Sequence, residues 1–364
     1  MIQTIPPEDV VIMAPAHPRA AEFDGSHPYR VVRDTYSQLL PTPRLLRAAL
    51  DVAIDEKVDL VQLGHPLPSG LLGPQIRRRT GLPYVVFLAG AEVTLPAALP
   101  VVGQTIRHVL RNASLLVAVS DYTARAASRQ VAGTVPARAL RPAISVDGFN
   151  PTHPYVKAAV KTALGIDGEL VVCLGRLVPR KGQDKLVDAL AILAGRHPRL
   201  HLALIGGGRL DRALRARARR LGVADRVHML GPLENDDLQT WFAAADLFSS
   251  PCRTRWGGLE VEGFGIVFAE AALAGLPVMA GRSGGAPEAV DMGDTGIVVD
   301  GSSSGEVAEG LARLLRLSAA ARRSMGARGR ALALSRHTPG AAGERYRELL
   351  LQATSSRGDG RGRS

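Results

Sequence analysis

Residues 170–183 read LVVCLGRLVPRKGQ, and this stretch decides the fold class of the second half of the 364-residue chain. Five apolar residues are followed at once by a glycine and a basic loop, and a helical pattern then runs over Gln183–Arg196. A short buried strand that leads through a glycine loop into a helix is the repeating unit of a parallel α/β sheet. The stretch therefore predicts an α/β fold.

The same alternation of short apolar runs and helical patterns extends in both directions. In the second half it predicts strands at Leu200–Ile205, Val227–Leu230, Leu247–Ser250 and Val278–Ala280, and a helix at Arg209–Leu221. In the first half it predicts helices at Pro43–Glu56 and Leu99–Asn112, and strands at Val10–Ala14, Tyr29–Arg33, Leu60–Leu63, Tyr84–Leu88, Leu115–Ser120 and Ala137–Arg141.

The segment Pro142–Pro154 separates the two series of elements, because it is rich in Pro, Asp, Asn and Gly and has no periodicity. We therefore expect two Rossmann-like domains that face a cleft, residues 1–150 and 151–337. Residues 338–354 are expected to form a C-terminal helix that packs back toward the first domain. Residues 355–364, rich in Gly, Arg and Ser, are expected to be a disordered tail.

Composition narrows the class of protein. The net charge of +11 favours anionic partners such as phosphates, nucleic acid or an anionic membrane surface. An aromatic content of 4% argues against nucleic-acid binding by base stacking. The sequence has no signal-peptide pattern and no apolar run that approaches a membrane span, and Cys173 and Cys252 lack metal-ligand spacing. These features together predict a cytoplasmic protein with reduced thiols.

The first motif with a chemical meaning is the loop Gly175–Gly182. It carries Arg176 and Lys181 between a predicted strand and a predicted helix. A planar guanidinium, a compact ammonium and a helix N-terminus together suit a diphosphate. A solvated basic loop would have the same sequence, so this motif alone does not decide between the two.

The second motif is Glu262–Glu270, EGFGIVFAE, a glycine-flanked loop that runs into a helix. Its two carboxylates are eight residues apart, a little over two helical turns, so both are expected on one face. The glycines let backbone N–H groups approach an anion, and a glutamate can accept hydrogen bonds from sugar or ribose hydroxyls. Taken alone, such spacing is a common accident of helices.

Two further glycine segments have structural explanations of their own. In Ser283–Glu288, SGGAPE, capping of a helix by Ser283 and Glu288 explains the pattern. A tight turn between strand and helix explains Gly206–Gly208. Neither segment by itself predicts a ligand.

The order of these motifs carries more information than any one of them. Strand–GRLVPRKGQ, strand–GGG–helix, strand–Leu230-Gly231, EGFGIVFAE and SGGAPE together resemble the C-terminal domain of GT-B retaining glycosyltransferases of the family 4 type. The resemblance covers nearly the whole chain and is greatest to actinobacterial phosphatidylinositol mannosyltransferases. Those enzymes add mannose from GDP-mannose to a phosphatidylinositol mannoside.

The resemblance implies roles for named residues. As catalytic residues, Arg176 and Lys181 would grip the donor diphosphate and stabilise leaving-group charge, while Glu262 would hold sugar hydroxyls. Glu270 would bond the ribose. The remaining donor-binding residues would be Gly231 and Leu233 beside the base, and Gly263, Phe264, Gly265 and Ile266, with the backbone of Gly265 and Ile266 at the phosphates. The family retains anomeric configuration and needs no metal or other cofactor, and the sequence has no D-x-D motif.

The chain departs from the family pattern at two places. Ile5-Pro6-Pro7 is not followed by Gly-Gly, so the first domain is expected to lack its opening strand–loop–helix unit. Ala89 and Ala91 stand where the family has a His-Gly-x-Glu motif, and His108 gives no sign of replacing the imidazole. Both departures predict slow turnover more than a loss of fold or of donor binding.

The leading hypothesis is therefore a hexosyltransferase that uses a nucleotide sugar and an inositol phospholipid at the inner face of the membrane, with no nucleic-acid partner. Basic segments that could attract the membrane are Arg77–Arg79, Arg209–Arg220 and the pair Arg107 and Arg111, although a solvated arginine face explains each of them equally well. One alternative is transfer to a soluble acceptor such as an antibiotic or cyclitol. A protein that binds nucleotide sugars with little activity is another. A Rossmann dinucleotide enzyme is disfavoured, because no G-x-G-x-x-G follows the first strand of either half.

Overall fold

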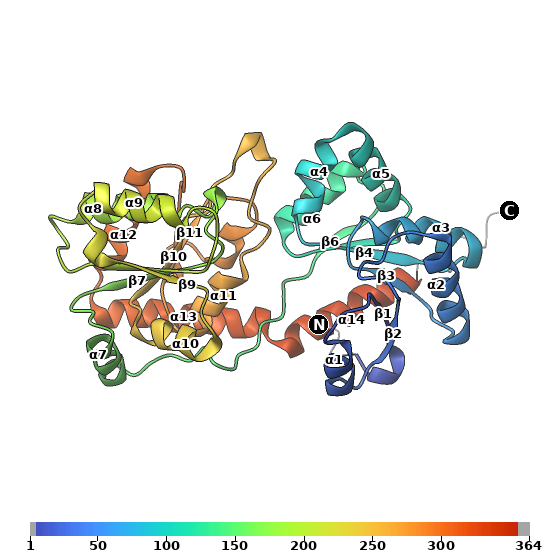
Figure 1. Cartoon of the computed structure of the whole chain (residues 1–364), viewed down its shortest axis with the longest axis horizontal. Helices are drawn as coiled ribbons and strands as arrows, with labels where there is room; N and C mark the ends of the chain where they lie inside the picture. The colour runs from blue at the N-terminus through green and yellow to red at the C-terminus, as the bar shows by residue number, and fades with distance from the viewer. Residues whose placement is uncertain (1–4, 356–364) are drawn as a thin grey trace. The chain divides into compact units, whose positions relative to one another are not determined.

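The computed structural model describes residues 5–355 and divides them into two compact units (Figure 1). One unit runs to Ala143 and resumes at Pro339, and the other spans Ile144–Thr338. The break between Ala143 and Ile144 falls inside the segment expected to link two domains, so residues 144–150 belong with the second unit.

The second unit is built on a parallel sheet of six strands in the order β12-β11-β10-β7-β8-β9. The reversal of order at β7 and β10 is typical of doubly wound folds, whose ligands bind beyond the carboxyl ends of the strands. The strands are β7 (Leu170–Leu174), β8 (His201–Ile205), β9 (Val227–Gly231), β10 (Leu247–Ser250), β11 (Val278–Gly281) and β12 (Gly296–Val299). The edge strand β12 was not predicted.

Helices cover both faces of this sheet, because successive side chains of each strand point to opposite sides. In β7, Val171 and Cys173 pack into one apolar core, while Leu170 and Val172 pack into the other. The first core is covered by α8 (Gln183–Leu193), α9 (Asp211–Arg220) and α12 (Ser304–Leu315). The second is covered by α10 (Asn235–Ala244), α11 (Ile266–Leu273) and part of α13 (Ala319–His337), with α7 (Pro154–Ala163) beside α10.

The starts of these helices fall into two kinds. Ser303 and Ser318 cap α12 and α13, since their hydroxyls accept from the N–H groups of Glu306 at 3.2 Å and Ala321 at 3.1 Å. By contrast, α8 and α11 begin after Gly182 and Gly265, which offer no side-chain cap. The first-turn N–H groups of α8 and α11 are thus left without a side-chain acceptor.

The first unit contains a four-stranded parallel sheet in the order β3-β4-β5-β6 and a separate parallel pair, β1 and β2. The strands are β1 (Val11–Ala14), β2 (Arg30–Arg33), β3 (Val61–Leu63), β4 (Tyr84–Leu88), β5 (Leu115–Ala118) and β6 (Ala137–Ala139). The helices are α1 (Ala20–Ser26), α2 (Pro43–Asp55), α3 (Leu72–Thr80), α4 (Leu95–Ala98), α5 (Pro100–Arg111), α6 (Asp121–Gln130) and α14 (Pro339–Ser355).

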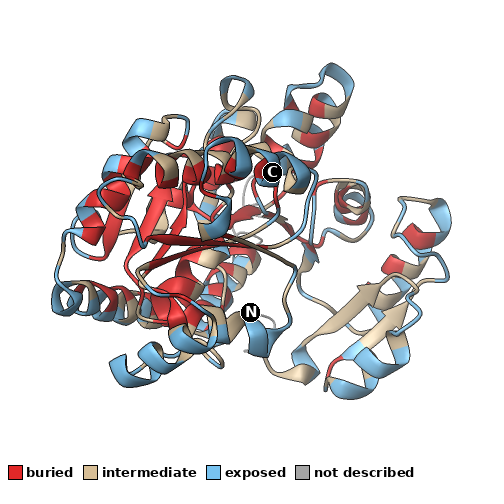
Figure 2. Ribbon diagram, turned by 60° about the vertical axis from the view of Figure 1, so that its left-hand side comes forward, coloured by how far each residue is buried: buried red, intermediate tan, exposed pale blue. Residues whose placement is uncertain are grey.

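Burial differs sharply between the two sheets of this unit (Figure 2). Strand β5 is buried throughout, whereas every residue of β1 is only half-buried. Met13 of β1 and Val61 of β3 both pack against the apolar cluster of α2 and α3, yet these two strands are not hydrogen-bonded to each other. Each therefore has a single neighbouring strand in the described part of the chain.

The C-terminal helix α14 packs on the four-stranded sheet. Tyr346 and Leu349 are buried against Val85 and Val117, and the Tyr346 hydroxyl donates to the side-chain oxygen of Gln62. Of the expected tail, Ser355 ends α14, and residues 356–364 lie outside the described part of the chain.

Candidate donor site

Four glycine loops meet at the carboxyl edge of the six-stranded sheet. The N–H of Gly175 donates to Ile205 O at 2.9 Å, and that of Leu177 donates to Gly207 O at 2.9 Å. Gly206 has φ 126°, and a Cβ there would lie 2.3 Å from Gly175 O. The backbone approach thus requires glycine, and the basic loop and the Gly206–Gly208 turn form one surface.

The basic loop continues through a short 3-10 turn, Pro179–Lys181, to Gly182 in the left-handed region. A Cβ on Gly182 would lie 2.1 Å from Pro251 O, so this loop presses against the residues that follow β10. The turn directs Lys181 into the protein, where the residue is 7% exposed, while Arg176 stays exposed to solvent. The two predicted phosphate-binding residues therefore have different environments.

Lys181 forms a buried ion pair with Glu262, the glutamate predicted to hold the sugar. Lys181 Nζ lies 2.8 Å from Glu262 Oε2, and each side chain is 9% exposed. The thiol of Cys252 donates to the same oxygen at 3.6 Å, and Arg180 lies 4.0 Å from it. Burial of this carboxylate is compensated by the two cations around it.

The backbone of Glu262 is held by the Ser283–Gly285 turn. The N–H of Glu262 donates to Ser283 Oγ at 3.2 Å, and the N–H of Gly285 donates to Glu262 O at 2.9 Å. A Cβ on Gly284 would lie 1.8 Å from Glu262 O. Ser283 therefore positions Glu262, which corrects the interpretation of its hydroxyl as a helix cap.

The prediction that Glu262 and Glu270 lie on one helical face was wrong. Helix α11 begins at Ile266, so Glu262 lies in the loop before the helix and the two glutamates do not share a helical face. Glu270 is on α11 and half-buried, and its carboxylate makes no hydrogen bond or ion pair to the described residues. Burial raises the pKa of Glu270 above its usual value.

The start of α11 supplies backbone donors. Gly265, with φ 84°, precedes the helix without a side-chain cap, and Ile266 in the first turn is 45% exposed. An uncapped helix N-terminus with an exposed first turn is suited to bind an anion. Phe264, one of the predicted donor-binding residues, is buried with its ring 5.2 Å from that of His337, so its side chain is structural.

The remaining predicted residues lie near the same edge of the sheet. Gly231 ends β9, and its carbonyl accepts from the N–H of Gly206 at 2.7 Å. Leu233 is half-buried against the core beside α10. Gly263 adjoins Glu262 in the loop before α11.

Sequence reasoning missed Arg180, Cys252 and the positioning role of Ser283. Arg180 NH1 is buried without a hydrogen-bond partner among residues 5–355, and its neighbour Lys181 was the only signal for it. Nothing in the sequence indicates that Cys252 contacts Glu262, because the loop after β10 carries no motif.

In the first unit, the segment with Ala89 and Ala91 is contacted by the imidazole of His65, through Glu92. Glu92 accepts from the N–H of Gly90 at 2.8 Å, and its other oxygen lies 3.0 Å from His65 Nδ1. His65 follows β3, which pairs with β4, so the loops after both strands meet at the same sheet edge. The position of His65 after a predicted strand was the available signal.

Two protein-family models match the chain. A model described as "Glycosyl transferases group 1" matches residues 157–332, and one described as "Glycosyltransferase Family 4" matches residues 8–138. A relative from Mycolicibacterium smegmatis, described as a GDP-mannose-dependent alpha-(1-6)-phosphatidylinositol monomannoside mannosyltransferase, is 38% identical over 94% of this chain and 90% of its own. The chain belongs to the family 4 glycosyltransferases.

Two further comparisons agree with this assignment. A Corynebacterium glutamicum mannosyltransferase, whose described acceptor is a monoacylated phosphatidylinositol monomannoside, is 35% identical to this glycosyltransferase over 96% of the chain and 91% of its own length. The crystal structure of Anabaena HepE in complex with UDP shares the fold, with a TM-score of 0.79 at 22% identity over 96% of this chain and 94% of HepE. Two Rossmann-like domains of the GT-B type are thereby established for this glycosyltransferase.

Proposed function

We propose that this glycosyltransferase transfers mannose from GDP-mannose to a phosphatidylinositol mannoside, with retention of anomeric configuration and without a metal ion. The names of its relatives support the donor and the acceptor. The observation that carries the proposal is the buried pair of Lys181 and Glu262 beside the uncapped start of α11. A cation, a carboxylate and free backbone donors are the groups that a sugar diphosphate requires.

The donor diphosphate binds at the start of α11. The backbone N–H groups of Gly265 and Ile266 donate to its oxygens, and the macrodipole of the helix favours the negative charge. Lys181 binds the phosphates from the protein side, and the exposed Arg176 binds them from the solvent side. Both cations stabilise the charge that develops on GDP as the glycosidic bond breaks, the role that a metal ion fulfils in other enzymes.

Glu262 binds the sugar. Its carboxylate is held in place by the Ser283–Gly285 turn, and it accepts hydrogen bonds from the mannose hydroxyls while Lys181 turns toward the phosphate. The pair seen in the structure is the arrangement that keeps both groups neutralised before the donor arrives. A carboxylate that the turn holds in place lowers the cost of reorganisation during the reaction.

Glu270 binds the ribose. Its carboxylate is half-buried and unpaired among the described residues, so two ribose hydroxyls can satisfy it. Gly231 and Leu233 border the base in this arrangement. In the first unit, His65 and Glu92 are the groups that we assign to the acceptor side.

No helix in residues 5–355 is both long and apolar enough to cross a membrane. We propose that the enzyme reaches its lipid acceptor as a peripheral protein, attracted by its net charge of +11 to anionic lipids.

A panel of donors and acceptors tests the proposed function. Transfer is measured with GDP-mannose, GDP-glucose and UDP-glucose, onto phosphatidylinositol mannoside in vesicles and onto soluble inositol phosphate. The expected result is preferential transfer from GDP-mannose to the lipid, with an α-linked product by NMR. Preferential transfer to the soluble acceptor, or binding of GDP without any transfer, would instead support one of the two alternatives raised by the sequence.

A further inference from the structure

A cavity of about 430 Å³ lies within the second unit, away from the donor site. Asp246 and Pro277 line it, and each directly precedes a strand, β10 and β11. The cavity is therefore at the edge of the sheet where these strands begin. The glycine loops of the donor site lie at the opposite, carboxyl edge of the same sheet. The cavity has no assigned role in sugar transfer.

The cavity has apolar walls and cationic groups. The walls come from α7, α10, α13 and the loop before β11, and include Pro154, Phe242, Leu276 and Leu334. Among its lining residues the cations are Lys157, Arg322, Arg323 and Arg330, and the single carboxylate is Asp246. The lining therefore carries an excess of positive charge.

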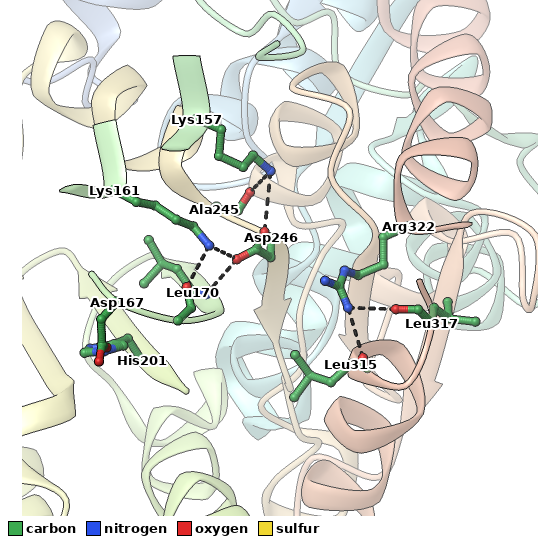
Figure 3. Close-up of polar contacts among 11 residues, drawn as sticks. Lys157, Lys161, Asp167, Leu170, His201, Ala245, Asp246, Leu315, Leu317 and Arg322 are labelled. Carbon is green, nitrogen blue, oxygen red and sulfur yellow. Dashed lines mark hydrogen bonds and ion pairs between the residues drawn. The ribbon is translucent and has the colours of Figure 1, made fainter. Parts of the chain in front are cut away.

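Asp246 is already neutralised by groups of this chain (Figure 3). Lys161, which does not line the cavity, forms an ion pair with Asp246 Oδ2, and the N–H of Leu170 donates to the same oxygen at 2.9 Å. Lys157 Nζ lies 3.7 Å from Asp246 Oδ1 and donates to Ala245 O at 2.5 Å. Because Asp246 is shared between two lysines, it cannot balance the three arginines of the lining.

Two of the lining arginines on α13, Arg322 and Arg323, have donors to spare, whereas Arg330 already donates to Phe149 O, Leu273 O and Asn150 Oδ1. Arg322 donates through NH1 to Leu315 O at 3.0 Å and Leu317 O at 2.9 Å, which fixes its guanidinium and leaves its other N–H groups available. Arg323 is exposed and makes no hydrogen bond or ion pair within residues 5–355. A fixed guanidinium beside a free one is an arrangement suited to the oxygens of a phosphate.

The residues next to the cavity are apolar and exposed. Tyr155 and Val156 lie in the first turn of α7, between the lining residues Pro154 and Lys157, and are 80% and 49% exposed. A tyrosine has an apolar ring and a polar tip, which suits the boundary between water and lipid. These exposed side chains belong to the same helix as the lining residues Pro154 and Lys157.

We propose that this cavity binds the phosphate headgroup of an anionic phospholipid. Arg322 and Arg323 bind the phosphate, the apolar walls contact the glycerol and the first methylene groups, and Tyr155 and Val156 contact the lipid surface. The volume falls within the range of roughly 300–1,000 Å³ that small-molecule sites occupy. Charge complementarity selects an anionic head over a zwitterionic one. The proposal stands independently of the sugar-transfer reaction.

The test is calorimetric titration of the full chain with dihexanoyl phosphatidic acid below its micellar concentration. Dihexanoyl phosphatidylcholine and inorganic phosphate are the comparison ligands. The variants are Arg323→Ala, which removes the free guanidinium, and Ala331→Trp, which fills the cavity from α13 without a change of charge. Arg313→Ala is the matched control, since Arg313 is an exposed arginine on α12 that does not line the cavity.

The expected result is saturable binding of phosphatidic acid by the unaltered chain and by Arg313→Ala, weakened at least about tenfold in Arg323→Ala and Ala331→Trp. GDP affinity should be unchanged in all variants, which verifies that the unit is folded. Equal affinity for phosphatidic acid across the variants would overturn the proposal. Inorganic phosphate that binds as tightly as phosphatidic acid would overturn the assignment to a lipid.

Discussion

At the scale of single residues, the buried pair of Lys181 and Glu262 determines how substitutions at the donor site behave. The sequence predicts both residues for the site but not their contact, because 81 positions separate them and nothing local specifies the pairing. The glycine loops could be predicted from their motifs. Their exact backbone contacts could not, since a Cβ clash such as that at Gly284 depends on a neighbour far along the chain.

Removal of Lys181 should damage both stability and binding. Lys181→Ala leaves the Glu262 carboxylate buried beside Arg180 alone, and breaking such a pair costs about 3–5 kcal/mol. Arg176→Ala should leave the free energy of unfolding unchanged, because Arg176 is exposed, yet weaken GDP binding by about 1.5–3 kcal/mol. Urea denaturation and calorimetry measure the two effects.

Addition of Glu262→Gln to Lys181→Ala should restore much of the stability that Lys181→Ala loses, because the buried carboxylate is then no longer charged. A double variant as unstable as the single one would refute this account of the pair.

Substitution of Glu270 should change the stability of the protein and its affinity for GDP in opposite directions. Because burial raises the pKa of Glu270, the folded protein holds this proton more tightly than the unfolded chain does. Its contribution to stability is therefore present at low pH and is lost as the pH rises through the raised pKa. Glu270→Gln should accordingly be more stable than the parent at pH 7 but bind GDP about tenfold more weakly. A variant with unchanged GDP affinity would remove Glu270 from the ribose site.

At the scale of elements, the strands of the second unit follow the predicted pattern with the exception of β12. Its apolar residues, Ile297–Val299, form a run as long as the predicted strand Val278–Ala280, and this run was overlooked. Pairing with β11 makes it a strand, which is a tertiary effect. The start of α11 is another such case, since the helix begins at Ile266 after a left-handed glycine and so excludes Glu262.

A side chain at Gly284 in the Ser283–Gly285 turn should lower the rate of sugar transfer, because its Cβ would clash with the backbone of Glu262. Gly284→Ala places a Cβ 1.8 Å from Glu262 O, which must displace the loop that carries the carboxylate. We expect a loss of transfer rate of at least about tenfold, because misplacement of a reacting group by 1 Å is costly. Gly293→Ala is the control, since Gly293 also has a positive φ, 84° against 55° at Gly284, but has open space around the added Cβ. Equal rates for the two variants would show that backbone strain alone, and not the clash, is responsible.

The pair β1 and β2 should be the first part of the sheets to open. Two parallel strands with half-buried residues have fewer apolar contacts than the buried β4 and β5. In hydrogen exchange followed by mass spectrometry, peptides over residues 11–14 and 30–33 should exchange well before those over 84–88 and 115–118. Equal protection of the two sheets would mean that β1 and β2 are stabilised by contacts beyond those described.

At the scale of the whole molecule, the chain forms two Rossmann-like units. The sequence predicts two units because the strand pattern restarts after a linker. The second unit carries the proposed donor site at one edge of its sheet and a cationic cavity at the other. The first unit brings His65 to Glu92 although the family motif around Ala89 is altered. His65 lies near Glu92 because β3 pairs with β4. No local sequence pattern predicts that pairing.

His65 should act on the acceptor side. His65→Ala is expected to lower the rate of mannose transfer about tenfold or more without any change in GDP affinity, because the imidazole lies in the unit that does not carry the donor site. His108→Ala on α5 is the control, since His108 is an exposed histidine of the same unit. A fall in GDP affinity for His65→Ala would contradict this assignment.

We propose that Glu262 and Lys181 bind the sugar and the diphosphate, respectively, of one donor molecule. The most direct measurement compares mannose transfer and GDP affinity for Glu262→Gln against the unaltered chain, with GDP-mannose and phosphatidylinositol mannoside as substrates. The account predicts a loss of transfer of at least about a hundredfold, with GDP affinity changed by less than about threefold, because the carboxylate contacts the sugar that GDP lacks. Undiminished transfer, or a loss that is fully explained by weaker GDP binding, would contradict it.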